Sequence, residues 1–203
     1  MAKIETVDYE KIPSQAAKMR ELGLQLNNEF TVAYLSVNDM RNDWYGKRYN
    51  ALLVEFNKLI KTLNDMLKLI VTDVPFSLET VANNYSNADQ GVNACQAQET
   101  AYIKINELQP STAVGLRFLT DSVSATQTKV SANFDKANEY MTNIEQVLNG
   151  MTWESEAAST FKEQFRTMKK NIVDAIGEIK TSFENNMKST KEEIQAAETA
   201  NTI

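Results

Sequence analysis

The side chains that could do chemistry in this sequence are few. The 203 residues contain no His, so the commonest general base and metal ligand are missing, together with any Ser-His or Cys-His pair. Cys95 is the only cysteine, which excludes an intrachain disulfide and a thiolate zinc cage, and we interpret it as a buried or linker thiol. No glycine loop typical of phosphate binding and no paired carboxylates are evident. The sequence therefore predicts no catalytic residue, metal or cofactor, and an enzyme is the least favoured class.

Charge and hydropathy favour protein partners. The chain has 21 Lys and Arg against 27 Asp and Glu, a net charge of −6. This balance does not provide the positive charge that binding to nucleic acid or anionic lipid requires. The stretch from Met1 to Asp8 lacks the apolar core of a signal peptide, and no later stretch approaches the roughly 18 apolar residues of a membrane span. We expect neither Sec export nor membrane insertion.

The elements that must position any functional residue are long helices, since only 6 Gly and 3 Pro interrupt the chain. Apolar residues spaced by three and four predict a helix over about 13–42, with Pro13 at a first helical position. A second stripe runs from Leu52 to Ile70 and should break or kink at Val74-Pro75, because a proline disfavours the helical conformation of the residue before it. The stripe then resumes after a Ser77 cap.

That resumed helix is predicted to reach about Ile105, and Pro110 is the best domain boundary. Beyond it, one stripe runs from Leu119 to Leu148 and stops at Asn149-Gly150, a plausible left-handed terminus, and a final stripe runs from Phe161 to Ile194. No stretch alternates apolar and polar residues long enough to predict a strand. The fold class is all-α.

The two halves, 1–108 and 109–203, are alike around their only tryptophans, Trp44 and Trp153. Large apolar residues follow each tryptophan at offsets of 8, 12, 15 and 19: Leu52, Phe56, Leu59 and Leu63 in the first half, and Phe161, Phe165, Met168 and Ile172 in the second. Each half is then a hairpin of two long helices with one apolar stripe uncovered. Two hairpins can cover both stripes as an antiparallel four-helix bundle, closed within one chain as a pseudo-dimer or by pairing with another chain.

A Trp-x-Gly sequence marks the first hairpin turn. Placed at the first helical position, Trp44 can fold its ring across the end of the core, and Gly46 leaves room beside that ring. The second copy places Ser155 two residues after Trp153, a small residue in place of glycine.

At these residues the chain resembles the WXG superfamily, the helical-hairpin proteins of the early secreted antigenic target (ESAT) type exported by type VII secretion. The resemblance covers both halves, as two such units fused in tandem. It implies a non-enzymatic protein found outside the cell or at its surface, which acts as an export substrate, a partner or an adaptor. The implied partners are the secretion ATPase and another WXG-like protein or a secreted toxin. The alternative class is a cytosolic or phage-type helical scaffold.

The family also carries a Tyr-x-x-x-Asp/Glu export signal after its second helix, and Tyr85 with Asp89 fits it here. Residues four apart project from one face of a helix, so a receptor could contact both. If the hairpins pack antiparallel, this pair should lie beside the second turn at Trp153 and Ser155, and the first turn should lie beside the tail near Ile194. The alternative is that Tyr85 belongs to the core stripe.

Overall fold

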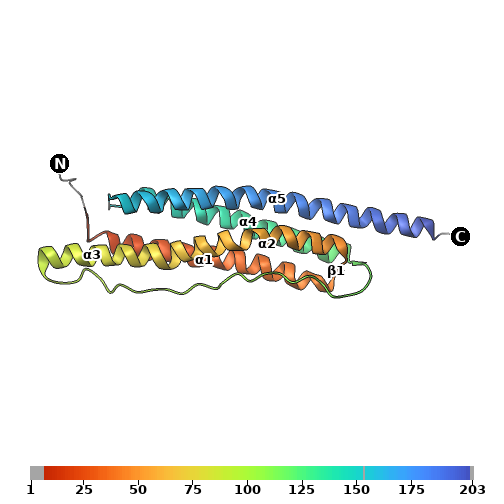
Figure 1. Ribbon diagram of the computed structural model, residues 1–203, viewed down its shortest axis with the longest axis horizontal. Helices are drawn as coiled ribbons and strands as arrows, with labels where there is room; N and C mark the ends of the chain where they lie inside the picture. The colour runs from red at the N-terminus through yellow and green to blue at the C-terminus, as the bar shows by residue number, and fades with distance from the viewer. Residues whose placement is uncertain (1–6, 153, 202–203) are drawn as a thin grey trace.

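A computed structural model of the chain describes residues 7–152 and 154–201, and it is mostly helical (Figure 1). The predicted all-α class is confirmed. Trp153 lies outside the described residues. The elements, in chain order, are α1 (Ile12–Asp39), a 3-10 turn (Met40–Asn42), β1 (Trp44–Tyr45), α2 (Lys47–Leu67), a π-helical segment (Lys68–Asp73), α3 (Val74–Gln90), β2 (Arg117–Phe118), α4 (Thr120–Asn149) and α5 (Glu156–Ala200).

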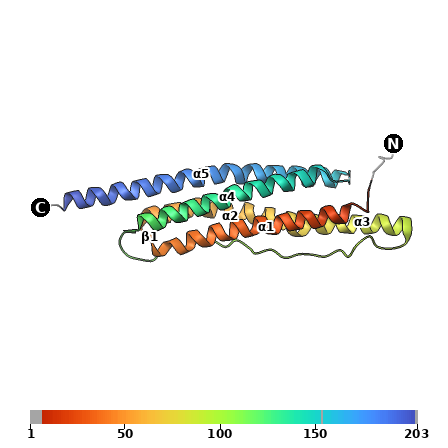
Figure 2. The same ribbon diagram turned by 180° about the vertical axis from the view of Figure 1, so that it is seen from behind.

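The helices lie side by side in an elongated molecule (Figures 1 and 2). The first hairpin is α1 with the continuous α2–π–α3 helix, and the second is α4 with α5. Across the hairpins, α1 packs on α4 and α2 packs on α5. The C-terminal part of α5 extends past the β1 end of the other helices (Figure 1).

The stripes read from the sequence form the core. Helix α1 buries the predicted apolar stripe from Ile12 to Val37 and begins with a proline in its first turn. The predicted helix over 13–42 is therefore found as Ile12–Asp39 followed by the 3-10 turn. Gly23 lets α1 approach the π segment closely, because a Cβ there would lie 2.8 Å from Val71 Cγ2.

The predicted kink at Val74-Pro75 takes the form of a π-helical segment. Lys68–Asp73 adopts the wider π pattern, and the helix continues into α3 with Pro75 in its first turn. A π segment changes the hydrogen-bond register, so it accommodates a proline without ending the helix. Ser77 consequently lies inside α3, and its predicted role as a cap is wrong.

The predicted continuation of this helix to Ile105 is also wrong. Helix α3 ends at Gln90 because Gly91 adopts a left-handed conformation (φ 73°) and donates its N–H to Asn87 O at 3.0 Å. Residues 92–116 then form an extended strap that returns along the first hairpin toward the start of α4 (Figures 1 and 2). The boundary proposed at Pro110 falls within this strap.

Both hairpin turns differ from the sequence expectation. Trp44 lies in β1, which pairs antiparallel with β2 through Trp44–Phe118 and Tyr45–Arg117, so a short strand pair exists where none was predicted. Helix α2 begins later, at Lys47. In the second turn Gly150 has φ −88°, so it is not the left-handed terminus expected there, and the Ser155 side chain caps α5 by accepting from Ala158 N at 3.1 Å.

Candidate functional site

The Trp44 corner is formed by the first turn, β2 and the distal part of α5. Trp44 is fully buried, with 0% of its side chain exposed. Its ring centroid lies 5.4 Å from Phe118, 5.9 Å from Tyr49 and 6.1 Å from Phe183. The ring therefore plugs the end of the core, as the sequence predicts, but it does so from a strand and joins its three partners into one aromatic cluster.

Gly46 has a backbone requirement as well as a spatial one. Its φ of 121° with ψ of −175° lies in a region that only glycine adopts readily. An added Cβ would also lie 3.3 Å from Leu116 Cδ1, so the residue crowded would be in the strap and not in a neighbouring helix. Conformation is therefore the main reason for glycine at this position.

Charged residues connect the Trp44 corner to the α5 tail, close to Ile194 as expected. Glu193 accepts hydrogen bonds from Arg48 Nε at 3.1 Å and Arg48 Nη2 at 2.8 Å, and it pairs with Lys47 Nζ at 3.1 Å. The hydrogen bond from Arg48 and then that from Lys47 lower the pKa of Glu193 below its usual value of 4.5. This corner is thus held by both aromatic and ionic contacts.

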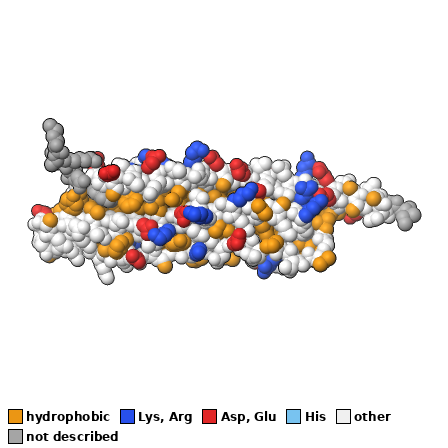
Figure 3. Space-filling view, viewed as in Figure 1, with side chains coloured by type: hydrophobic (Ala, Val, Ile, Leu, Met, Phe, Trp, Pro, Cys, Tyr) orange, Lys and Arg blue, Asp and Glu red, His pale blue; other side chains and the backbone are white. Residues whose placement is uncertain are grey.

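The Tyr85 corner lies at the other end of the molecule, where α3 meets the beginning of α5. Tyr85 is 38% exposed on α3, whereas Leu78 and Ala82 on the same helix are buried, so Tyr85 is not a core residue. Figure 3 shows hydrophobic side chains gathered along the boundary between α3 and α5 at this end. A groove here is lined by Val81, Tyr85, Ser155, Glu156, Ala157, Thr160 and Phe161. The expected approach of Tyr85 to the second turn is therefore present at Ser155.

Asp89 lies one turn beyond Tyr85 and has a partner that sequence reasoning missed. Tyr9 donates its hydroxyl to Asp89 Oδ2 at 2.5 Å, and Gln90 Nε2 donates to the Tyr9 oxygen at 2.9 Å. The hydrogen bond to Asp89 raises the pKa of Tyr9. No local pattern signals a contact between residues 80 positions apart. The N-terminal segment therefore holds one member of the predicted Tyr-x-x-x-Asp pair.

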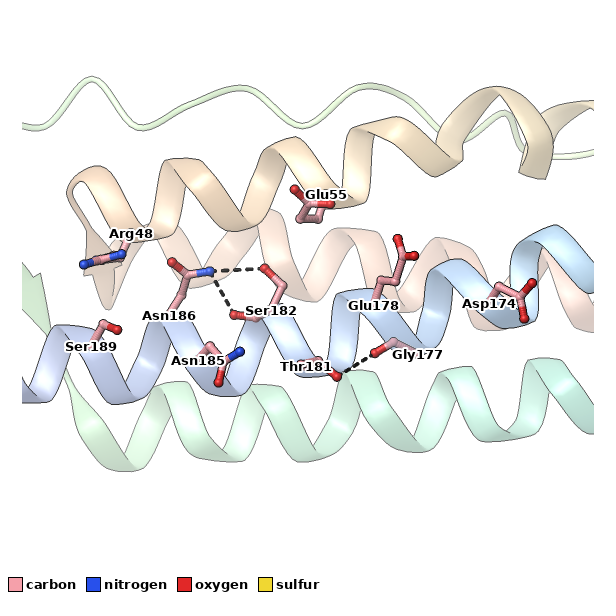
Figure 4. A pocket seen from close by; sticks show the side chains of 10 residues that line it. All are labelled: Arg48, Glu55, Asp174, Gly177, Glu178, Thr181, Ser182, Asn185, Asn186 and Ser189. Atoms are coloured by element: carbon pink, nitrogen blue, oxygen red, sulfur yellow. Dashed lines mark hydrogen bonds between the residues drawn. The ribbon is translucent and has the colours of Figure 1, made fainter.

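A polar groove lies between α2 and α5 (Figure 4). Its side chains come from Arg48 and Glu55 on α2 and from polar residues of α5. Asn186 Nδ2 donates to Ser182 O at 2.8 Å and to Ser182 Oγ at 3.1 Å, within the same helix. These groups are engaged along their own helix and form no arrangement of nucleophile and base.

Asparagines of α2 form a set that the sequence analysis overlooked. Asn50, Asn57 and Asn64 are seven residues apart, and each binds the main chain of the strap. A polar residue repeated at one heptad position beside an apolar stripe was the available signal. These residues hold the strap against the first hairpin.

Cys95 lies in the strap and is half-buried. Burial raises the pKa of its thiol, and nearby Glu79 raises it further, so the nucleophilic thiolate is disfavoured. Within residues 7–152 and 154–201, no cluster of three or more His, Cys, Asp or Glu could hold a metal ion. In the same part of the chain, no helix combines the length and apolar character needed to cross a membrane.

No protein-family model, curated protein or solved structure matches the chain.

Proposed function

We propose that this chain is a non-enzymatic protein of the tandem WXG type, exported by a type VII secretion system to the medium or the cell surface. Its two hairpins, 1–108 and 109–203, act as an ESAT-like antiparallel four-helix bundle in which one chain provides both halves of the dimer. Outside the cell it acts as a partner or adaptor for another WXG-like protein or a secreted toxin.

The observation that carries this proposal is the Trp44 turn. A buried tryptophan plugs the end of the hairpin, and Gly46 provides a backbone conformation that other residues reach only under strain. The Trp-x-Gly sequence therefore has a physical role, which is to close a helical hairpin. The resemblance to the WXG superfamily rests on this same sequence.

The Tyr85 corner supports the same proposal. Tyr85 on one hairpin and Ser155 on the other line a common groove, so a receptor placed there would contact both hairpins at once. The groove offers apolar surface between α3 and α5, and the carboxylate of Asp89 adds a negative charge on α3. We assign recognition by the secretion ATPase to this composite surface.

The alternative function, a cytosolic or phage-type helical scaffold, would use the same bundle without export. Expression in the native host with and without the secretion ATPase separates the two. Our proposal predicts that the chain accumulates in the supernatant only when the ATPase is present, with a cytosolic marker as the lysis control. Equal retention in both cell pellets would support the scaffold.

A further inference from the structure

The strap is held through its main chain by side chains of the first hairpin. Asn57 donates its amide to Leu108 O and accepts from Leu108 N, both at 2.9 Å. Asn64 makes the same pair of bonds with Ile105, again at 2.9 Å each. From α1, Asn27 holds the N and O of Ile103 at 2.7 Å. A side-chain amide thus takes the place that a neighbouring strand would have in a sheet.

We call these side-chain contacts to the strap main chain the ladder. Its spacing on the helix, in ångströms, matches its spacing on the extended strap. Asn50, Asn57 and Asn64 lie seven residues apart on α2 and contact Ser111, Leu108 and Ile105, which lie three apart on the strap. Seven helical residues rise about 10.5 Å. Three extended residues rise roughly 9–10 Å. The two repeats run in opposite directions and stay in register over these three contacts.

A buried ion pair continues the ladder toward α3. Arg20 and Glu79 pair at 2.9 Å between α1 and α3. Arg20 Nη2 donates to Gln98 O at 3.2 Å, and Glu79 Oε2 accepts from Gln98 N at 3.0 Å. The charged pair therefore binds both main-chain groups of one strap residue, as Asn27, Asn57 and Asn64 do.

These contacts place few demands on the sequence of the occupant. They engage the C=O group, which every residue provides, and the N–H group, which every residue except proline provides; Pro110 falls between the residues whose N–H is used. The strap side chains that are fully buried are two aliphatic residues three apart, Ile105 (3% exposed) and Leu108 (6% exposed), while Ala94 and Tyr102 pack against the core and stay partly exposed. Ile103 is held by Asn27 through its main chain alone, since its side chain is 62% exposed.

We propose that the groove between α1 and α2–α3 is a binding site for an extended peptide segment of a partner protein, and that the strap occupies it as an intramolecular competitor. The ligand class is an extended segment with two large aliphatic side chains three residues apart and no proline at the contacted N–H groups. The observed occupant defines this chemistry. The inference goes beyond the proposed export function and does not depend on it.

The test uses the full-length chain with a weakened strap. Ile105→Asp together with Leu108→Asp removes both anchors and leaves every ladder residue in place. The probe is a fluorescent synthetic peptide with the sequence of residues 99–112, and the readout is fluorescence anisotropy. Because a tethered strap competes at an effective concentration near the millimolar range, we expect the weakened chain to bind the peptide at least about ten-fold more tightly than the intact chain does.

Matched controls identify which groups of the peptide the groove binds. Adding Asn27→Ala to the weakened chain should reduce peptide binding by about ten-fold, because both bonds to one residue are lost, whereas the exposed neighbour change Asn28→Ala should leave binding unchanged. A peptide N-methylated at Leu108 should bind at least about ten-fold less tightly than one N-methylated at Glu107, which lies between the held residues.

Circular dichroism shows whether each variant is folded, and light scattering shows whether it is monomeric or dimeric. If the double variant is unfolded, Leu108→Ala takes its place, with an expected affinity between those of the intact and doubly substituted chains. A folded weakened chain that binds the peptide no more tightly than the intact chain would overturn the proposal, and the ladder would only fasten the strap. A weakened chain that dimerises instead of binding peptide would also overturn it, since the occupant would then be a second copy.

Discussion

The Trp44 corner and the Tyr85 corner each bring the two hairpins together, but their surfaces are opposite in character. At the Trp44 corner a fully buried indole contacts three aromatic rings, and Glu193 links α5 to α2 through two cations. At the Tyr85 corner the aromatic side chain is partly exposed along a groove, and Asp89 is held by a hydrogen bond from Tyr9.

Under the proposed export function, this difference predicts a division of roles. Burial and aromatic packing make the Trp44 corner a contributor to stability, with little surface left for a partner to read. The Tyr85 corner leaves apolar and acidic groups accessible, which costs the fold little and suits recognition. Substitutions at the two corners should therefore affect different properties, stability at one and export at the other.

The largest expected effect is that of Trp44→Ala. Removing a fully buried indole leaves a cavity in the aromatic cluster and should lower the free energy of unfolding by about 3–5 kcal/mol. Urea denaturation followed by circular dichroism measures it. The control is Leu35→Ala, a residue 56% exposed on α1, which should change stability by no more than about 0.5 kcal/mol. Equal effects of the two substitutions would mean that the indole does not plug the core.

The second effect, that of Gly46→Ala, tests whether glycine is needed at this position for its backbone conformation or only for its small size. Gly46→Ala forces a side chain into a strained conformation at φ 121° and should cost about 1–3 kcal/mol. Gly177→Ala lies in α5 with nothing within 4 Å of the added Cβ, so it should stabilise the protein by about 0.5–1 kcal/mol. Opposite signs in the same denaturation assay support our account, and a neutral Gly46→Ala contradicts it.

The sequence predicts the second hairpin well and the first only in outline. Apolar residues at spacings of three and four place α4 and α5 close to their observed bounds because those helices depend on one periodic signal. Helix α3 ends early at Gly91, since a left-handed glycine terminus outweighs the apolar residues that follow it. Val92 and Cys95, which favoured a longer helix, lie in the strap.

Part of the geometry of the two corners could be predicted from the same apolar periodicity. Burial of Trp44 and its nearness to the α5 tail follow from hairpin packing, which periodicity describes. The β1–β2 pair and the contact between Tyr9 and Asp89 depend on residues more than 70 positions apart, so no local pattern contains them. The asparagine heptad was visible in the sequence, but its meaning required the strap to be placed beside it.

The smallest expected effect on stability concerns pH. Because Arg48 and Lys47 lower the pKa of Glu193 in the folded state, the ion pairs stabilise the fold above the usual pKa of 4.5, and this contribution is lost as pH falls through the lowered value. Glu193→Gln should therefore melt slightly below the unchanged protein at pH 7, and the two melting curves should converge under more acidic conditions. A difference that grew on acidification would contradict this assignment.

The central claim is that the secretion ATPase recognises the Tyr85 corner. It is tested most directly by one paired measurement on Asp89→Ala. Supernatant level in the native host and melting temperature are determined for the same variant, with Tyr9→Phe as the control that removes the hydrogen bond but keeps the carboxylate. We predict that both variants melt within about 2 °C of the unchanged protein, that Tyr9→Phe is exported, and that Asp89→Ala is retained in the cells. A folded Asp89→Ala protein exported at the unchanged level would contradict the assignment.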